Sequence, residues 1–162
     1  MIPTPARCLI LACGNTLRED DGLGPWLAEW AEDRFASEPA VRVLARQQWT
    51  PDLAEDIAAT ECVLFLDCSI ESAPGAVRLA EVSPAAQGPG LATHHIGASE
   101  LLALEQELYG AQPRLALLLT VGAESTELGE TFSPAVDAAL PAACNLLELT
   151  IHQMLNKPDQ RK

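Results

Sequence analysis

Three uninterrupted apolar runs constrain the fold of this 162-residue chain more than any other feature. They occupy residues 8–13, 62–67 and 115–121. A strand with one face in water alternates apolar and polar residues, whereas a continuous apolar run of this length is typical of a strand covered on both faces. We therefore expect these three runs to form the interior strands of a sheet that has helices on both sides.

Further strand-like and helix-like segments alternate with these runs. Two more strands are predicted at 41–47 and 76–82. Helices are predicted at about 23–36, 51–59, 97–108 and 134–156. Alternation of strands and helices along the chain indicates an α/β fold. We predict a single domain over residues 1–162, a three-layer α/β/α sandwich with a central, mostly parallel sheet of about five strands.

The last predicted helix carries one signal at its start and another in its interior. Ser133 followed by Pro134 is a favourable pair for the N-cap and the first helical position. Pro141 lies further along the same helix. Because proline has no backbone N–H and its ring clashes with the preceding turn, Pro141 predicts a kink or a break.

The composition indicates which classes of partner the protein can bind and in which cellular compartment it occurs. The formal net charge of −13 opposes binding to nucleic acid or to an anionic membrane surface, because both carry the same sign of charge. The five cysteines, an odd number without a C-x-x-C pair, indicate reduced thiols rather than a disulfide or zinc framework. The apolar run near the N-terminus is too short for a membrane span and lacks the flanks of a signal peptide. We therefore predict a cytoplasmic protein.

Polar residues follow several of the predicted strands, at the place where a fold of this class binds its ligands. In open α/β sheets, ligand sites lie outside the carboxyl ends of the strands. The first strand leads into Gly-Asn and then into Asp20 and Asp21, and the third strand ends at Asp67. The long loop after the fourth strand carries His94 and His95. Carboxylates and an imidazole could therefore converge at one edge of the sheet.

A phosphate-binding loop and a helix cap are the alternatives for the segment after the first strand. Neither G-x-G-x-x-G nor G-x-x-x-x-G-K-S/T is present, and two aspartates stand where an anion would need amide donors. The same aspartates with a histidine suit a divalent cation. Acidic residues before an amphipathic run are also typical of a helix N-terminus. The residues alone leave the metal site and the helix cap open. The chain lacks both the H-E-x-x-H of zinc peptidases and the G-x-S-x-G elbow of serine hydrolases.

Four blocks of sequence follow one another in the order of a known protease family. The string G-N-x-L-x-x-D-D-G-x-G runs from Gly14 to Gly24, and an apolar strand then ends at Asp67. H-x-x-G follows at 94–97, and VGAESTELGETFSPAV precedes the last helix. Over nearly its whole length the chain resembles the hydrogenase maturation proteases, the endopeptidases that trim the large subunit of nickel-iron hydrogenases. Ala12 stands where the family usually has a glycine, a departure that concerns the end of the strand rather than the ligands.

The resemblance implies a set of site residues and an activity. The family's metal ligands are an acidic residue of the first motif, the aspartate that ends the third strand and the histidine of H-x-x-G, which correspond here to Asp21, Asp67 and His94. The resemblance implies that these three residues bind the metal and also take part in catalysis. The chain would then be a nickel-dependent endopeptidase of aspartyl or metallo type. It would remove the C-terminal extension of the large-subunit precursor after nickel insertion. The nickel would arrive with that precursor, so the resemblance implies no organic cofactor, and it implies a monomer.

A non-catalytic nickel-binding or hydrogenase-assembly module that uses the same residues is the alternative function. For the neighbouring residues we expect supporting roles. Asp20 is expected to cap the following helix, and a contribution of Asp20 to the metal site stays open. Consecutive side chains of an extended chain point to opposite sides, so His95 is expected to be a neighbour of the ligands rather than a ligand. By the same rule, the sulfur of Cys68 is expected to face away from the site and to take no part in catalysis.

Two more segments lie at the predicted rim of the site. Glu124 and Glu127 follow the fifth strand and are either solvated or face a basic peptide segment. Gln47, Gln48 and Trp49 follow the second strand. We expect the tryptophan to be packed against the domain rather than exposed for contact with another protein.

Overall fold

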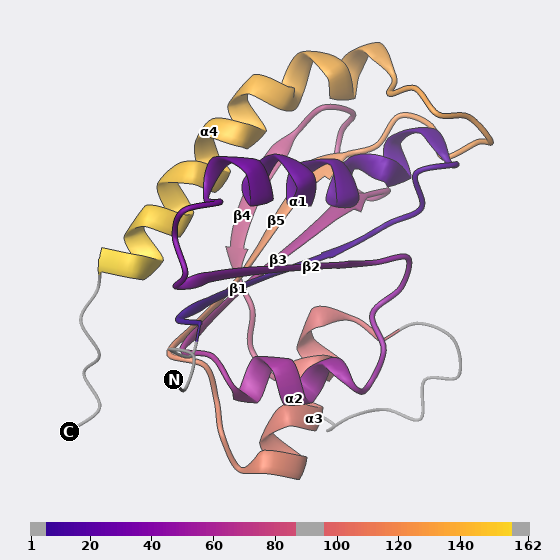
Figure 1. Ribbon diagram of the computed structural model, residues 1–162. Helices are drawn as coiled ribbons and strands as arrows, with labels where there is room; N and C mark the ends of the chain where they lie inside the picture. The colour runs from indigo at the N-terminus through magenta and orange to yellow at the C-terminus, as the bar shows by residue number, and fades with distance from the viewer. Residues whose placement is uncertain (1–5, 87–95, 157–162) are drawn as a thin grey trace.

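The three continuous apolar runs become the neighbouring central strands of a five-stranded sheet in the computed structural model, which describes residues 6–86 and 96–156 (Figure 1). The strands are β1 (Cys8–Cys13), β2 (Val41–Arg46), β3 (Cys62–Ser69), β4 (Val77–Glu81) and β5 (Leu115–Gly122). Their order is β2-β1-β3-β5-β4, and all neighbours are parallel except β4 and β5. The prediction of a mostly parallel central sheet is confirmed.

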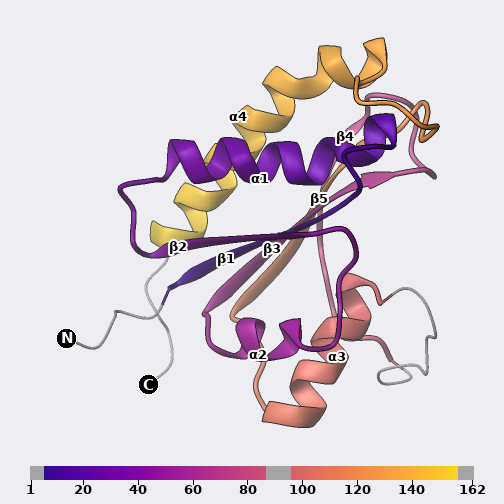
Figure 2. The ribbon, with the colours of Figure 1, turned by 45° about the vertical axis from the view of Figure 1, so that its right-hand side comes forward.

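Helices cover both faces of this sheet, as the sequence pattern predicts. They are the 3-10 helix η1 (Glu19–Gly22), α1 (Leu23–Arg34), α2 (Leu53–Ala58), α3 (Ala98–Tyr109) and α4 (Pro134–Asn156). Helices α1 and α4 lie on one face, and α2 and α3 lie on the other (Figure 2). None of the helices within the described ranges is long and apolar enough to cross a membrane.

The burial of β1 and β3 explains why their sequences do not alternate. In β1, the side chain of Ile10 enters the core beneath α1 and α4, while Leu9 and Leu11 enter the core beneath α2 and α3. All three side chains are fully buried. The outer strand β4 pairs on one side only, and most of its residues are exposed, which explains its weaker apolar pattern.

A close approach between α1 and the sheet positions the loop that follows β1. A Cβ atom on Gly24 would lie 2.2 Å from the carbonyl oxygen of Cys13 and 3.1 Å from that of Leu66. Only glycine allows the helix to come so near the ends of β1 and β3. As a result η1, which directly precedes α1, lies at the carboxyl ends of these two strands.

Helix α4 begins as predicted but does not break at Pro141. The N–H of Val136 donates to Ser133 Oγ at 3.4 Å, and Pro134 is the first helical residue. Of the predicted kink or break, the break is wrong, because the helix is continuous through Pro141. Pro141 removes only the hydrogen bond to the carbonyl of Asp137, and both residues are exposed, so water can bond to that carbonyl.

Candidate metal-binding site

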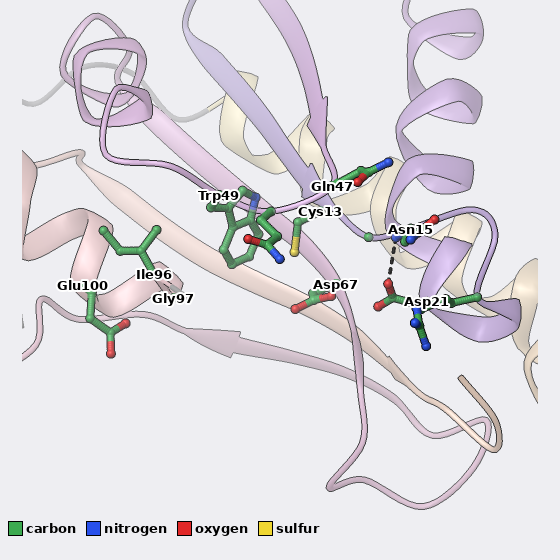
Figure 3. Close-up of a pocket in the computed structure, with 12 residues that line it drawn as sticks. Cys13, Asn15, Asp21, Gln47, Trp49, Asp67, Ile96, Gly97 and Glu100 are labelled. Atoms are coloured by element: carbon green, nitrogen blue, oxygen red, sulfur yellow. Dashed lines mark hydrogen bonds between the residues drawn. The ribbon is translucent and has the colours of Figure 1, made fainter. Parts of the chain in front are cut away.

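A pocket of about 560 Å³ opens where β1, β2 and β3 end, at the edge of the sheet (Figure 3). The chain leaves β1 toward β2 on one side, while β3 lies on the other side, so the connections diverge here. Such a divergence is the usual place for a ligand in an open α/β sheet. Asp21 from η1 and Asp67 from the end of β3 both line the pocket.

Asp21 is oriented by the backbone of the Gly-Asn pair that follows β1. Its Oδ2 accepts a hydrogen bond from the N–H of Asn15 at 2.7 Å. Gly14 has φ +148°, and a Cβ atom there would lie 1.9 Å from the carbonyl oxygen of Asp21. The turn therefore needs glycine both for its backbone conformation and for the close approach. Asn15 Oδ1 accepts the N–H of Leu17 at 2.9 Å, which stabilises the same turn.

Asp67 points into the same pocket from β3, and its surroundings make it unusually basic. Its Oδ1 accepts the backbone N–H of Cys68 at 2.8 Å, and the thiol of Cys13 also bonds to this carboxylate. Burial raises the pKa of Asp67 to about 6, the negative charge of Asp21 adds to the rise, and the two hydrogen bonds oppose it. The carboxyl therefore titrates close to neutral pH.

Cys68 does not line the pocket, as strand alternation predicts, but its sulfur lies closer to the carboxylates than expected. Cys68 Sγ lies 3.5 Å from Asp21 Oδ1, within hydrogen-bonding distance for a thiol. Asp67 and Cys68 follow each other on β3 and leave it on opposite sides, but Asp21 lies beyond the strand end and reaches both. Burial, then the charges of Asp67 and Asp21, raise the pKa of the Cys68 thiol to about 12. The thiol therefore keeps its proton at neutral pH unless a cation replaces it.

Asp20 does not cap a helix, and that prediction is wrong. Its side chain is fully buried and belongs to a different network from that of Asp21. Its carboxylate accepts the N–H groups of Glu124 (2.8 Å), Ser125 (3.1 Å) and Ser133 (2.8 Å), and the hydroxyl of Ser133 (2.8 Å). Burial acts to raise the pKa of Asp20, but these hydrogen bonds outweigh it and hold the pKa below its usual range. Asp20 thus joins η1 to the segment between β5 and α4.

The two histidines of the sequence pattern, His94 and His95, lie outside the described residues. The next two residues of the chain, Ile96 and Gly97, line the pocket. A Cβ atom on Gly97 would lie 2.6 Å from a carboxylate oxygen of Glu100, so the glycine of H-x-x-G makes room for this side chain at the start of α3. The role of His94 as a ligand stays a prediction.

The residues expected at the rim divide into two groups. Gln47, Gln48 and Trp49 line the pocket, and the prediction that the tryptophan is packed is confirmed: it is 7% exposed and its ring lies 5.1 Å from that of Phe65. Glu124 and Glu127 have exposed side chains that do not line the pocket.

Sequence reasoning missed three further residues of the pocket lining, namely Cys13, Arg18 and Glu100. Cys13 ends β1, so the rule that ligands bind at the carboxyl ends of strands could have found it. No local signal marks the other two. Arg18 is the single cationic side chain among the described residues that line this pocket.

Two carboxylates of the pocket and one thiol outside its lining form a donor set that suits a divalent cation. One ligand atom from each of Asp21, Asp67 and Cys68 can be chosen so that all three lie within 4.8 Å of one another. Neither carboxylate forms an ion pair with a cationic side chain in the described part of the chain. Two carboxylates that lie together without a cationic partner repel each other, and a cation between them removes this repulsion.

The chain is similar in sequence and in fold to hydrogenase maturation proteins. No family model matches the chain. It is 28% identical to the hydrogenase expression/formation protein HoxM of Azotobacter vinelandii over 145 residues, which cover 86% of this chain and 70% of HoxM. The hydrogenase 2 maturation peptidase of a Thaumarchaeota archaeon is 26% identical, with a TM-score of 0.63 and coverage of 90% of this chain and 98% of that chain.

The NiFe hydrogenase maturation protease HycI of Thermococcus kodakarensis is similar to the same extent. It is 25% identical, with a TM-score of 0.66 and coverage of 94% of each chain. The resemblance to hydrogenase maturation proteases inferred from the sequence motifs is therefore confirmed.

The adjacent aspartates of η1 should differ sharply in their effect on stability. Asp20→Asn replaces one of the two acceptor oxygens of the carboxylate by an NH2 donor, so some of the buried N–H groups lose their acceptor. We therefore expect the free energy of unfolding to fall by about 3 kcal/mol or more. Asp21→Asn removes a half-buried charge next to Asp67, and the change should stay within about 1 kcal/mol. Chemical denaturation of both variants measures the difference. Equal losses would contradict the assignment of separate roles.

Asp67→Asn should stabilise the metal-free protein at neutral pH. A carboxyl whose pKa is about 6 in the folded protein and 3.8 as its ordinary value opposes folding once it is ionised. The penalty is full above about pH 6, disappears below about pH 4 and amounts to about 1–3 kcal/mol. Thermal unfolding of wild type and variant at several pH values tests this. A variant that is less stable than wild type at pH 7.5 would contradict it.

Proposed function

We propose that the protein is an endopeptidase that removes the C-terminal extension of a nickel-iron hydrogenase large subunit after nickel has been inserted. In this proposal Asp21, Asp67 and His94 bind the nickel that the substrate carries. One observation supports it above all: two carboxylates from distant parts of the chain face one pocket at the carboxyl edge of the sheet. The similarity to HoxM and to archaeal maturation proteases supports the substrate class.

The electrostatics of the pocket favour a cation that arrives from outside. The ionised carboxylates of Asp21 and Asp67 repel each other, which is one reason why the pKa of Asp67 is raised. Carboxylates together with an imidazole are ligands that nickel accepts. His94 supplies this imidazole in the proposal, since it stands two residues before Ile96, which lines the pocket.

Three protein ligands leave coordination positions for the groups of the substrate that already hold the nickel. The shared ion then fixes the position of the peptide relative to the enzyme. Such an ion can polarise the carbonyl of the scissile bond or lower the pKa of a bound water. The pKa of about 6 belongs to Asp67 in the metal-free pocket, and a bound cation would lower it and keep this carboxylate ionised as a ligand.

The pocket is large and open enough for an extended peptide rather than an isolated ion. Its volume of about 560 Å³ falls in the range of sites that enclose an organic ligand. Amide side chains of Gln47 and Gln48 line one wall and offer both donors and acceptors to a peptide backbone. We expect the protein to meet its substrate as a cytoplasmic monomer.

Incubation of the purified protein with nickel-loaded large-subunit precursor tests the proposal. Mass spectrometry should show a large subunit shortened at its C-terminus. Asp67→Asn and His94→Ala should each abolish shortening, because each removes a ligand of the shared nickel. Glu127→Gln is the matched control, since this exposed carboxylate lies outside the pocket lining and its loss should leave the rate unchanged.

The other outcomes separate the two candidate functions. Stable binding of the precursor without shortening would indicate a non-catalytic assembly module. Processing at the wild-type rate by the Asp67 and His94 variants would contradict the assignment of the ligands.

A further inference from the structure

We propose that Cys68 is a ligand of the same ion, so that the site binds the metal through a sulfur as well as through the carboxylates of Asp21 and Asp67. The inference rests on the proposed metal site and deepens it. It adds a thiolate to the donor set and thereby narrows the class of ion that the site selects.

The distances among the donor atoms carry the inference. Cys68 Sγ and one oxygen from each of Asp21 and Asp67 all lie within 4.8 Å of one another. Two ligands of one ion, with bonds of about 2.0–2.3 Å, are separated by at most about 4.5 Å. An ion placed among these three atoms therefore needs only small side-chain movements to bind all of them.

The hydrogen bond of the thiol marks the place of the ion. Cys68 Sγ lies 3.5 Å from Asp21 Oδ1, a distance at which the thiol can donate a hydrogen bond to the carboxylate. When a divalent ion binds, the S–H bond breaks, the proton leaves to solvent, and the sulfur keeps the electron pair that forms the bond to the metal. No oxidant or reductant is needed.

The thiol of Cys13 lines the pocket, unlike that of Cys68, and has a different environment. It donates its hydrogen bond to Asp67 and is not part of the set of atoms that lie within 4.8 Å. We assign Cys13 a positioning role, because its hydrogen bond fixes the orientation of the Asp67 carboxylate. The two cysteines are therefore a matched pair of half-buried thiols, each next to one carboxylate of the site.

A thiolate ligand changes the selectivity of the site. Carboxylates alone suit Mg²⁺ and Ca²⁺, whereas a sulfur ligand favours softer ions such as nickel, zinc and cadmium. With Cys68 as a ligand, the site distinguishes a nickel-loaded partner from one that presents a hard cation.

Cadmium titration of the purified protein, without precursor, tests the inference. We expect wild type to develop the ultraviolet charge-transfer band of a sulfur-cadmium bond. Cys68→Ser should abolish this band and weaken cadmium binding, measured by calorimetry, at least about tenfold. Cys13→Ser should retain the band, and Cys144→Ser is the control for a half-buried thiol on α4. Excess Mg²⁺ should not displace the cadmium.

Three results would overturn the inference: a band that persists in Cys68→Ser, a band that disappears in Cys13→Ser alone, or an absence of any band in wild type. Circular dichroism of the three variants verifies that each is folded. The cadmium titration uses no hydrogenase precursor. A negative result in the titration would therefore contradict Cys68 as a ligand without contradicting the proposed cleavage activity. Conversely, loss of cleavage activity would leave the charge-transfer result standing.

Discussion

The buried carboxylate of Asp20 is the contact on which the geometry of the site depends. It accepts four hydrogen bonds from the segment between β5 and α4 and thereby holds η1 in place. The N–H of Glu19 donates to the carbonyl of Gly129 at 2.8 Å in the same contact. Glu19 has φ +43°, which is unusual for a residue other than glycine, and these hydrogen bonds offset the strain. Asp21, the next residue after Asp20, is then presented to the pocket.

The site combines this rigid support with a local electrostatic penalty. Gly24 brings α1 against the ends of β1 and β3, so that Asp21 and Asp67 come close although both are negatively charged. The raised pKa of Asp67 reflects the free-energy cost of ionising this carboxyl in the folded protein. Burial and the neighbouring charge both disfavour its ionised form. The pair lowers the stability of the metal-free protein above about pH 6. In the proposed function this arrangement favours a cation carried by the partner, because the cation would remove the repulsion between the carboxylates.

The sequence predicted the parts of this structure that depend on local patterns. Continuous apolar runs identified β1, β3 and β5 as central strands, and the strand-end rule brought Asp21 and Asp67 to one edge. Asp20 was misassigned because its partners lie more than a hundred residues away in the chain. The contact between Cys68 and Asp21 was missed because alternation describes the faces of a strand and not what lies beyond its end. The predicted break at Pro141 failed because Asp137 and Pro141 are exposed, so that water can bond to the carbonyl that loses its helical partner.

The central claim is that Asp21 and Asp67 bind one ion together. Anomalous diffraction from crystals soaked in cadmium tests this most directly. We expect the strongest anomalous peak at the carboxyl ends of β1 and β3, within coordination distance of both carboxylates. A peak bound by one of them alone, or a strongest peak at exposed residues such as Glu124 and Glu127, would contradict it.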